Sequence, residues 1–88
     1  MVRKLRWTRR ALGKLDEITA YIAKDSPIRA TTFVRELREK VNILGEHQLG
    51  KPGRVYGTKE MVLHKHYLAV YRVKDGEVHI LTIHHTAQ

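Results

Sequence analysis

The chain has 88 residues, enough for one domain and too few for a second hydrophobic core. Seventeen Lys and Arg residues against nine Asp and Glu residues give a formal net charge of +8, which attracts nucleic acid, ribosomes or acidic proteins. The lack of cysteine excludes disulfides and thiolate metal sites, and neither a signal-peptide pattern nor a membrane-spanning apolar run is present, so we expect a cytoplasmic protein without a membrane partner.

The N-terminal part has the pattern of a short strand followed by a helix. Residues 3–7 alternate basic and apolar side chains, which predicts a strand. Thr8 is a plausible N-cap, and apolar residues then recur at steps of three and four as far as Ile22. This spacing predicts an amphipathic helix that ends near Asp25.

A second amphipathic helix follows almost directly. Ser26 and Pro27 form a helix-start signature, a capping hydroxyl followed by proline in the first turn. One apolar stripe runs over residues 30–44, and Gly45 is the expected end. The two helices should therefore form a helical hairpin.

The C-terminal half has the pattern of strands. Glycine and proline at residues 50–53 predict a turn, and strands are predicted over residues 54–64, 67–74 and 77–85. Asp75 and Gly76 form a strong signal for a two-residue hairpin. The predicted fold is α+β, in the order β-α-α-β-β-β, with residues 1–88 as one domain and the helical hairpin packed on one face of an antiparallel sheet.

The middle strand of this half has two different faces. Its uncharged face is predicted to meet the core, and its other face to remain open as a working surface that carries Arg72. The expected core face consists of Tyr67, Ala69, Tyr71 and Val73, and the expected open face of Leu68, Val70 and Arg72.

The expected first helix carries the pattern Trp7, Ala11, Leu15, Ile18, Tyr21 and Ile22, and the second carries Ala30 and Phe33. Three further stretches follow at residues 53–62, 67–73 and 78–88. Together these residues, which span essentially the whole chain, resemble the ParE/RelE superfamily of toxins, and the match to ParE-like members is the closer one.

The resemblance implies the toxin of a type II toxin–antitoxin system, which arrests growth when free and is neutralised by a cognate acidic antitoxin. RelE-like members enter the ribosomal A site and cut messenger RNA. ParE-like members inhibit DNA gyrase and have no established nuclease chemistry. The resemblance implies no cofactor for either branch.

The residues that an RNA endonuclease would need decide between these branches. Cleavage by 2′-hydroxyl attack requires a base, a cation at the phosphate and an acid. Lys59 matches one lysine of the ribonuclease members, but Leu68 and Met61 stand where those members carry basic residues, and the tail has no arginine or tyrosine. We therefore expect inhibition of gyrase. A ribosome-dependent endonuclease is the alternative, and an inactive member that only binds its antitoxin is a third possibility.

Two overlapping sets of candidate site residues follow from these alternatives. If the protein is a ribonuclease, the catalytic candidates are Lys59, Arg72, His84 and His85. For His85, closing the last strand through backbone hydrogen bonds is the competing role. The candidates for contact with the target or nucleic acid are Arg54, Tyr56, Lys59, His64, Lys65, His66 and Arg72.

The aromatic residues and the histidines suggest further roles. Tyr56 is the aromatic residue expected at a surface, whereas Trp7 and Tyr67 are expected in the core. The six histidines suggest metal binding, but no cysteine or nearby acidic ligand accompanies them, so we expect no metal site.

Overall fold

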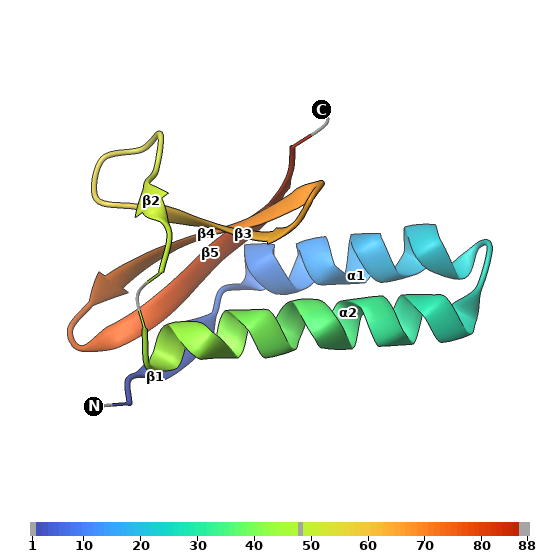
Figure 1. The fold of residues 1–88 in the computed structure, drawn as a ribbon, viewed down its shortest axis with the longest axis horizontal. Helices are drawn as coiled ribbons and strands as arrows, with labels where there is room; N and C mark the ends of the chain where they lie inside the picture. The colour runs from blue at the N-terminus through green and yellow to red at the C-terminus, as the bar shows by residue number, and fades with distance from the viewer. Residues whose placement is uncertain (1, 48, 87–88) are drawn as a thin grey trace.

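In a computed structural model, which describes residues 2–47 and 49–86, a helical hairpin lies against one face of a five-stranded sheet (Figure 1). The strands are β1 (Lys4–Trp7), β2 (Lys51–Pro52), β3 (Lys59–His64), β4 (Tyr67–Lys74) and β5 (Glu77–His85). The predicted fold class is confirmed. Neither helix in the described part of the chain is long and apolar enough to span a membrane.

Both helices begin where the sequence predicts. In α1 (Arg9–Ala23), the Thr8 side chain accepts a hydrogen bond from the Ala11 amide, and in α2 (Pro27–Asn42) the Ser26 side chain accepts one from the Arg29 amide. The short 3₁₀ helix η1 (Ile43–Gly45) extends α2 to the predicted glycine. The buried residues of the two helices form one stripe each, consisting of Ala11, Leu15 and Ile18 in α1 and Ala30, Leu37 and Val41 in α2.

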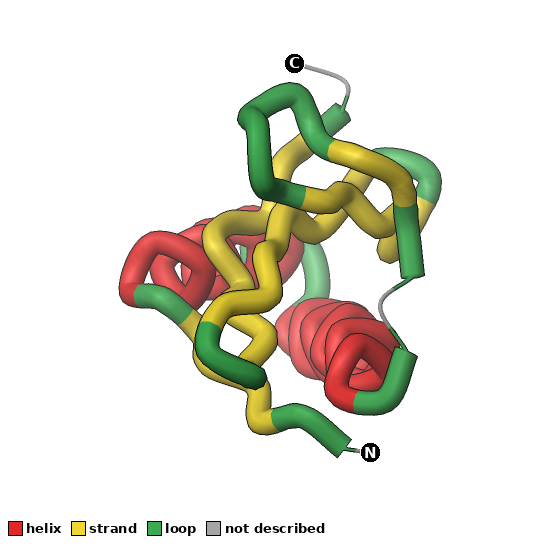
Figure 2. Tube along the Cα trace, turned by 90° about the vertical axis from the view of Figure 1, so that its left-hand side faces the viewer, coloured by secondary structure: helices red, strands yellow, loops and turns green. Residues whose placement is uncertain are grey.

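The sheet is mixed, whereas the sequence analysis expected an antiparallel one. The strand order is β1-β5-β4-β3-β2, and β1 runs parallel to β5 while the other pairs are antiparallel. A parallel pair requires a long crossover connection, which almost the whole chain supplies here. The sheet twists strongly between its two edges (Figure 2).

The strand predicted over residues 54–64 begins later than expected, at Lys59 of β3. Residues 53–58 form a loop, closed by a hydrogen bond from the Gly53 amide to the Thr58 carbonyl (2.8 Å) and one from the Thr58 hydroxyl to the Val55 carbonyl (2.6 Å). The prediction that Arg54 lies on a strand is therefore wrong, because these local hydrogen bonds replace strand pairing until Lys59.

The core lies between the helices and the expected face of β4. Ala69 and Tyr71 are fully buried, and the Tyr71 hydroxyl donates a hydrogen bond to the Leu49 carbonyl (2.6 Å). Val73 is 41% exposed, so the core face ends before the end of β4. Leu68, on the other face of β4, is also buried.

The predicted hairpin between β4 and β5 has both central residues in the left-handed region, with φ of +53° at Asp75 and +74° at Gly76.

We expect Gly76→Val to lower the free energy of unfolding by about 1–3 kcal/mol, because a β-branched residue is strained at this φ. No atom lies within 4 Å of the position of an added Cβ, so the cost is conformational. Urea denaturation measures it. Asp75→Asn is the control, since asparagine tolerates positive φ, and equal stability of the two variants would contradict this account.

Candidate functional site

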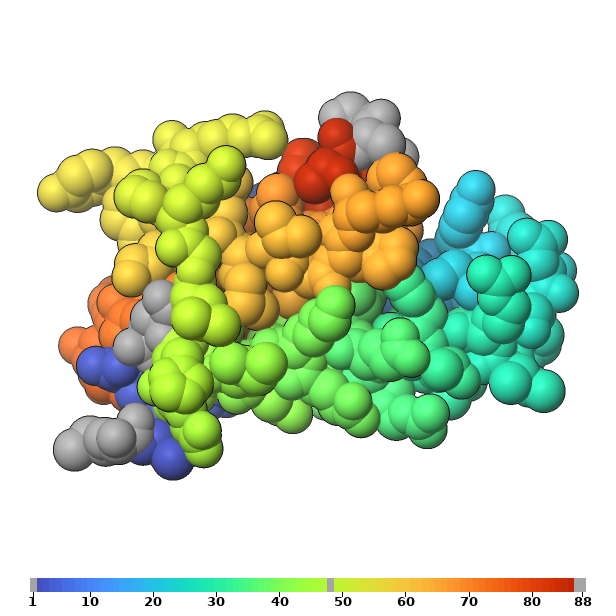
Figure 3. Space-filling view, viewed as in Figure 1, coloured from blue at the N-terminus to red at the C-terminus, as the bar shows by residue number. Residues whose placement is uncertain are grey.

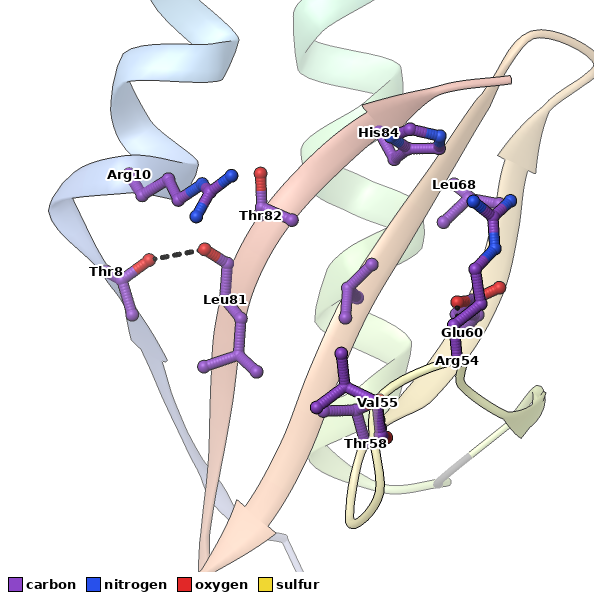
Figure 4. Close-up of a pocket in the computed structure, with 11 residues that line it drawn as sticks. Thr8, Arg10, Arg54, Val55, Thr58, Glu60, Leu68, Leu81, Thr82 and His84 are labelled. Atoms are coloured by element: carbon purple, nitrogen blue, oxygen red, sulfur yellow. Dashed lines mark hydrogen bonds between the residues drawn. The ribbon is translucent and has the colours of Figure 1, made fainter.

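A groove of about 530 Å³ lies on the open face of the sheet, opposite the helices (Figure 4). Its floor is formed by the apolar side chains of Leu68, Val70 and Leu81. Arg10 stands on one side of the groove, and Arg54 stands across from it. An apolar floor between two guanidinium groups can bind an amphipathic, negatively charged partner.

Thr8 fixes the side of the groove that Arg10 occupies. Its hydroxyl lies 2.9 Å from the carbonyl oxygens of both Ile80 and Leu81 on β5 and donates to them. The same side chain caps α1 through the Ala11 amide. The first turn of α1 is thereby attached to the bulged part of β5, which brings Arg10 to the rim.

Glu60 fixes the opposite side. Its carboxylate on β3 accepts a hydrogen bond from the Arg54 backbone amide (3.2 Å), which holds the loop of residues 53–58 beside the sheet. Val55 and Thr58 of this loop also line the groove. The loop therefore turns a flat sheet face into a hollow one.

The predicted site residues do not gather in one place. Arg54 and His84 line the groove, and Arg72 lies farther along the same face of β4. Lys59 is paired with buried Tyr71 and shares its face, so it lies on the helix side of the sheet, at an exposed position. Lys59 therefore lies on the other side of the sheet from Arg72, and the candidates Arg54, Lys59 and Arg72 do not form one cationic surface.

The other histidine candidates form an aromatic cluster near the β3–β4 turn. The His66 and His85 rings are stacked with centroids 5.8 Å apart, and the His85 ring meets Tyr67 edge-on at 4.8 Å. The His64 ring contacts Phe33 of α2 at 5.1 Å. Because these contacts place the three imidazoles on the helix side, only His84 of the predicted histidines lines the groove.

Further features of this region bear on the predicted roles. Lys65 is exposed within the turn. Burial, together with the nearby Tyr21 hydroxyl, raises the pKa of Tyr67 above its ordinary value, so its phenol remains protonated at neutral pH. Among the described residues, no group of three or more His, Asp or Glu side chains is placed to hold a metal ion.

The predicted positions of Tyr56, Trp7 and Tyr67 are confirmed, but the exposure of Tyr21 was not predicted. Tyr56 is fully exposed, while Trp7 and Tyr67 pack against the core, and the Arg38 guanidinium lies 5.8 Å from the centre of the Trp7 ring. Tyr21 is 71% exposed, although the sequence analysis assigned it only to the helix pattern.

Arg10 was also missed as a site residue. Arg10 lies two residues after the N-cap of a helix that directly follows a strand. This position in the sequence could have indicated that its side chain lies near the edge of the sheet.

Glu77 on β5 makes a pH-dependent contribution to stability. His79 Nε2 and Arg6 Nε lie 3.3 and 3.0 Å from its carboxylate. The hydrogen bond with His79, aided by the charge and the hydrogen bond of Arg6, holds the pKa of Glu77 below its ordinary value, although desolvation opposes this shift. Because its pKa is lower in the folded state, the ionised Glu77 carboxylate stabilises the fold fully at pH values above its ordinary pKa of about 4.3. This stabilisation is lost as the pH falls through the lowered pKa.

We therefore expect the stability of Glu77→Gln to fall less steeply than that of the wild type as the pH drops below about 4.3. Urea unfolding in a pH series measures this slope. Glu36→Gln, at an exposed position on α2, is the control. A slope in Glu77→Gln identical to the wild type would contradict the assignment.

Comparison with known proteins identifies the family. Residues 5–88 match the model of a protein family described as the ParE toxin of the type II toxin–antitoxin system parDE. The chain belongs to the ParE toxin family. This ParE-family chain is 43% identical over 88 residues to toxin Y4kP of Sinorhizobium fredii, with 98% of this chain and 91% of that protein covered. It is 36% identical over 84 residues to toxin RelE2 of Caulobacter vibrioides, with 93% of each covered.

Solved structures agree with this ParE-family fold. A chain of the chromosomal ParDE toxin–antitoxin system from P. aeruginosa superimposes with a TM-score of 0.88 at 31% identity, covering 96% of both chains. A chain of the toxin–antitoxin complex RelBE2 from Mycobacterium tuberculosis superimposes with a TM-score of 0.62 at 22% identity, covering 97% of this chain and 99% of that one. The second likeness concerns the fold alone. The predicted relationship to the ParE/RelE toxins is confirmed.

Proposed function

We propose that this toxin arrests bacterial growth by inhibiting DNA gyrase, and that a cognate acidic antitoxin neutralises it by covering the open-face groove. The observation that carries the proposal is the apolar floor of the groove. Leu68 and Val70 occupy this floor, where an RNA-cleaving site would require cations near the scissile phosphate.

The distribution of the basic residues also favours gyrase over RNA cleavage. Lys59 and His85 lie on the helix side of the sheet, whereas Arg72 and His84 lie on the open face. General acid and base groups must reach one substrate together. An apolar floor with a charged rim is instead typical of a surface that binds another protein.

The antitoxin fits the same groove by charge and polarity. The net charge of +8 favours an acidic partner. An amphipathic segment can place apolar side chains on Leu68, Val70 and Leu81 while its carboxylates face Arg10 and Arg54. The similar ParDE structure comes from a toxin–antitoxin system, which supports a partner of this kind.

A ribosome-dependent endonuclease is the second candidate, and His84 favours it. This imidazole lines the groove together with Arg10 and Arg54. An imidazole that titrates near neutral pH can act as a base or an acid, while a guanidinium can stabilise a phosphate.

Expression of the gene without its antitoxin separates the candidates. We expect loss of negative supercoiling of a reporter plasmid before protein synthesis declines, and inhibition of purified gyrase by the purified chain in a supercoiling assay. Early collapse of translation with messenger RNA cut at codons would overturn the proposal in favour of the endonuclease. Normal growth would overturn it in favour of an inactive member.

A further inference from the structure

A second polar surface lies on the open face, at the β4–β5 hairpin end of the sheet. Two rows of cross-strand neighbours run over β1, β5 and β4. Lys4 pairs with Glu77, which pairs with Lys74, and Arg6 pairs with His79, which pairs with Arg72. Their neighbours Val78 and Ile80 point into the core, so the rows point away from the helices. We call the six residues of these rows the cationic ladder.

The ladder carries an excess of positive charge. Lys4, Arg6, Arg72 and Lys74 oppose Glu77 and, in the adjoining turn, Asp75, so four cations face two carboxylates and the net charge is +2. Glu77 is already paired with Arg6 and His79.

The remaining cations of the ladder are available to a ligand. Within residues 2–47 and 49–86, Lys4, Arg72 and Lys74 form no ion pair, and all three are exposed.

The shape of the ladder suits a long, regular polyanion. The two rows are separated by two residues along the strands, which is about 7 Å. Each row extends across three strands, which is about 10 Å. The β4–β5 turn lies at the end of the molecule opposite the α1–α2 connection (Figures 1 and 3). The rows also point away from the helices, so the helical hairpin does not cover them.

We infer that the cationic ladder binds the phosphate backbone of double-stranded DNA. Its rows contain no apolar side chain, so they offer little to the amphipathic antitoxin segment that the neighbouring groove fits. Phosphate contacts need only charge and hydrogen-bond donors. The rows contain no Phe, Tyr or Trp to stack unpaired bases, which favours a duplex over a single strand. The choice of DNA over RNA rests on the proposed action on gyrase, whose substrate is duplex DNA.

The test measures binding of the full chain to a labelled random-sequence DNA duplex by fluorescence anisotropy, without gyrase. We expect sequence-independent binding that weakens steeply between about 50 and 200 mM salt. The double variant Arg72→Glu/Lys74→Glu should bind about tenfold or more weakly and show a shallower salt dependence, by about two units of slope. Circular dichroism confirms that the variant is folded.

Lys24→Glu/Arg29→Glu is the matched control, because it changes the net charge equally at exposed positions at the far end of the helical hairpin. We expect its affinity for DNA to remain within about twofold of the wild type. Equal losses in the two double variants would overturn the inference in favour of diffuse charge. Tighter binding to duplex RNA of the same length would overturn the choice of DNA.

A supercoiling assay on the same proteins keeps the two proposals apart. A wild-type chain that inhibits gyrase but binds DNA no better than the ladder variant would overturn the DNA inference and leave the proposed function standing. A chain that binds DNA through the ladder but does not inhibit gyrase would overturn the proposed function alone.

Discussion

Replacing Val70 by Asp should weaken antitoxin binding by a factor of about 100 or more while the toxin stays folded. Val70 is half-buried on the floor of the open-face groove. A carboxylate there would lose its hydration beneath the partner's apolar side chains and would repel the partner's acidic groups. Isothermal titration calorimetry of the purified toxin with its antitoxin measures the change.

Val73→Asp is the matched control for this prediction. Val73 lies on the same strand and is 41% exposed, but it points to the opposite face and does not line the groove. Its substitution should change the affinity by less than about threefold, as expected outside a binding hot spot. Equal losses for the two variants would show that the antitoxin does not depend on the groove floor.

Removal of the Tyr71 ring should have the largest effect on stability. Tyr71 is fully buried on β4, the middle strand of the sheet, and belongs to the core cluster that the sheet forms with α1, α2 and η1. We expect Tyr71→Ala to lower the free energy of unfolding by about 3–5 kcal/mol, since truncation of a buried aromatic ring leaves a cavity. For a domain of this size, each kcal/mol corresponds to a fall in melting temperature of about 4–8 °C.

Tyr71→Phe separates the ring from the hydroxyl. The hydroxyl donates to the Leu49 carbonyl at 2.6 Å and thereby attaches the segment after η1 to the sheet. Loss of this hydrogen bond alone should cost about 0.5–1.5 kcal/mol. Urea denaturation of both variants gives the comparison. If the phenylalanine variant is as unstable as the alanine variant, the hydrogen bond contributes more than the packing of the ring.

The sequence predicted the parts of the fold that local interactions determine. The caps at Thr8 and Ser26 and the apolar spacing of both helices depend only on neighbouring residues. The turn at Asp75 and Gly76 is likewise set by the φ angles that these two residues tolerate. These elements lie where they were expected.

The parts that were wrong depend on strand register and on side-chain contacts that the pattern of residues does not specify. A one-residue change in strand register reverses the face of every side chain, so the sequence could not place Lys59 on the helix side without its pairing to Tyr71. The loop that carries Arg54 bends beside the sheet because Glu60 accepts its amide. Arg10 reaches the groove through the contact of Thr8 with β5. The pairing of Lys59 with Tyr71 and the contact of Thr8 with β5 join residues far apart in the sequence, whereas the hydrogen bond between Arg54 and Glu60 lies within a segment whose pattern predicted one continuous strand.

The pairing of β1 with β5 has a consequence for the synthesis of the protein. The last strand lies between the first strand and β4, so the sheet cannot close until residues 77–85 have left the ribosome. A nascent chain that lacks them has neither the floor of the groove at Leu81 nor the Ile80 and Val78 part of the core. The producing cell therefore meets a folded toxin only after residues 77–85 have been translated and released, and a product terminated before them is a substrate for proteolysis.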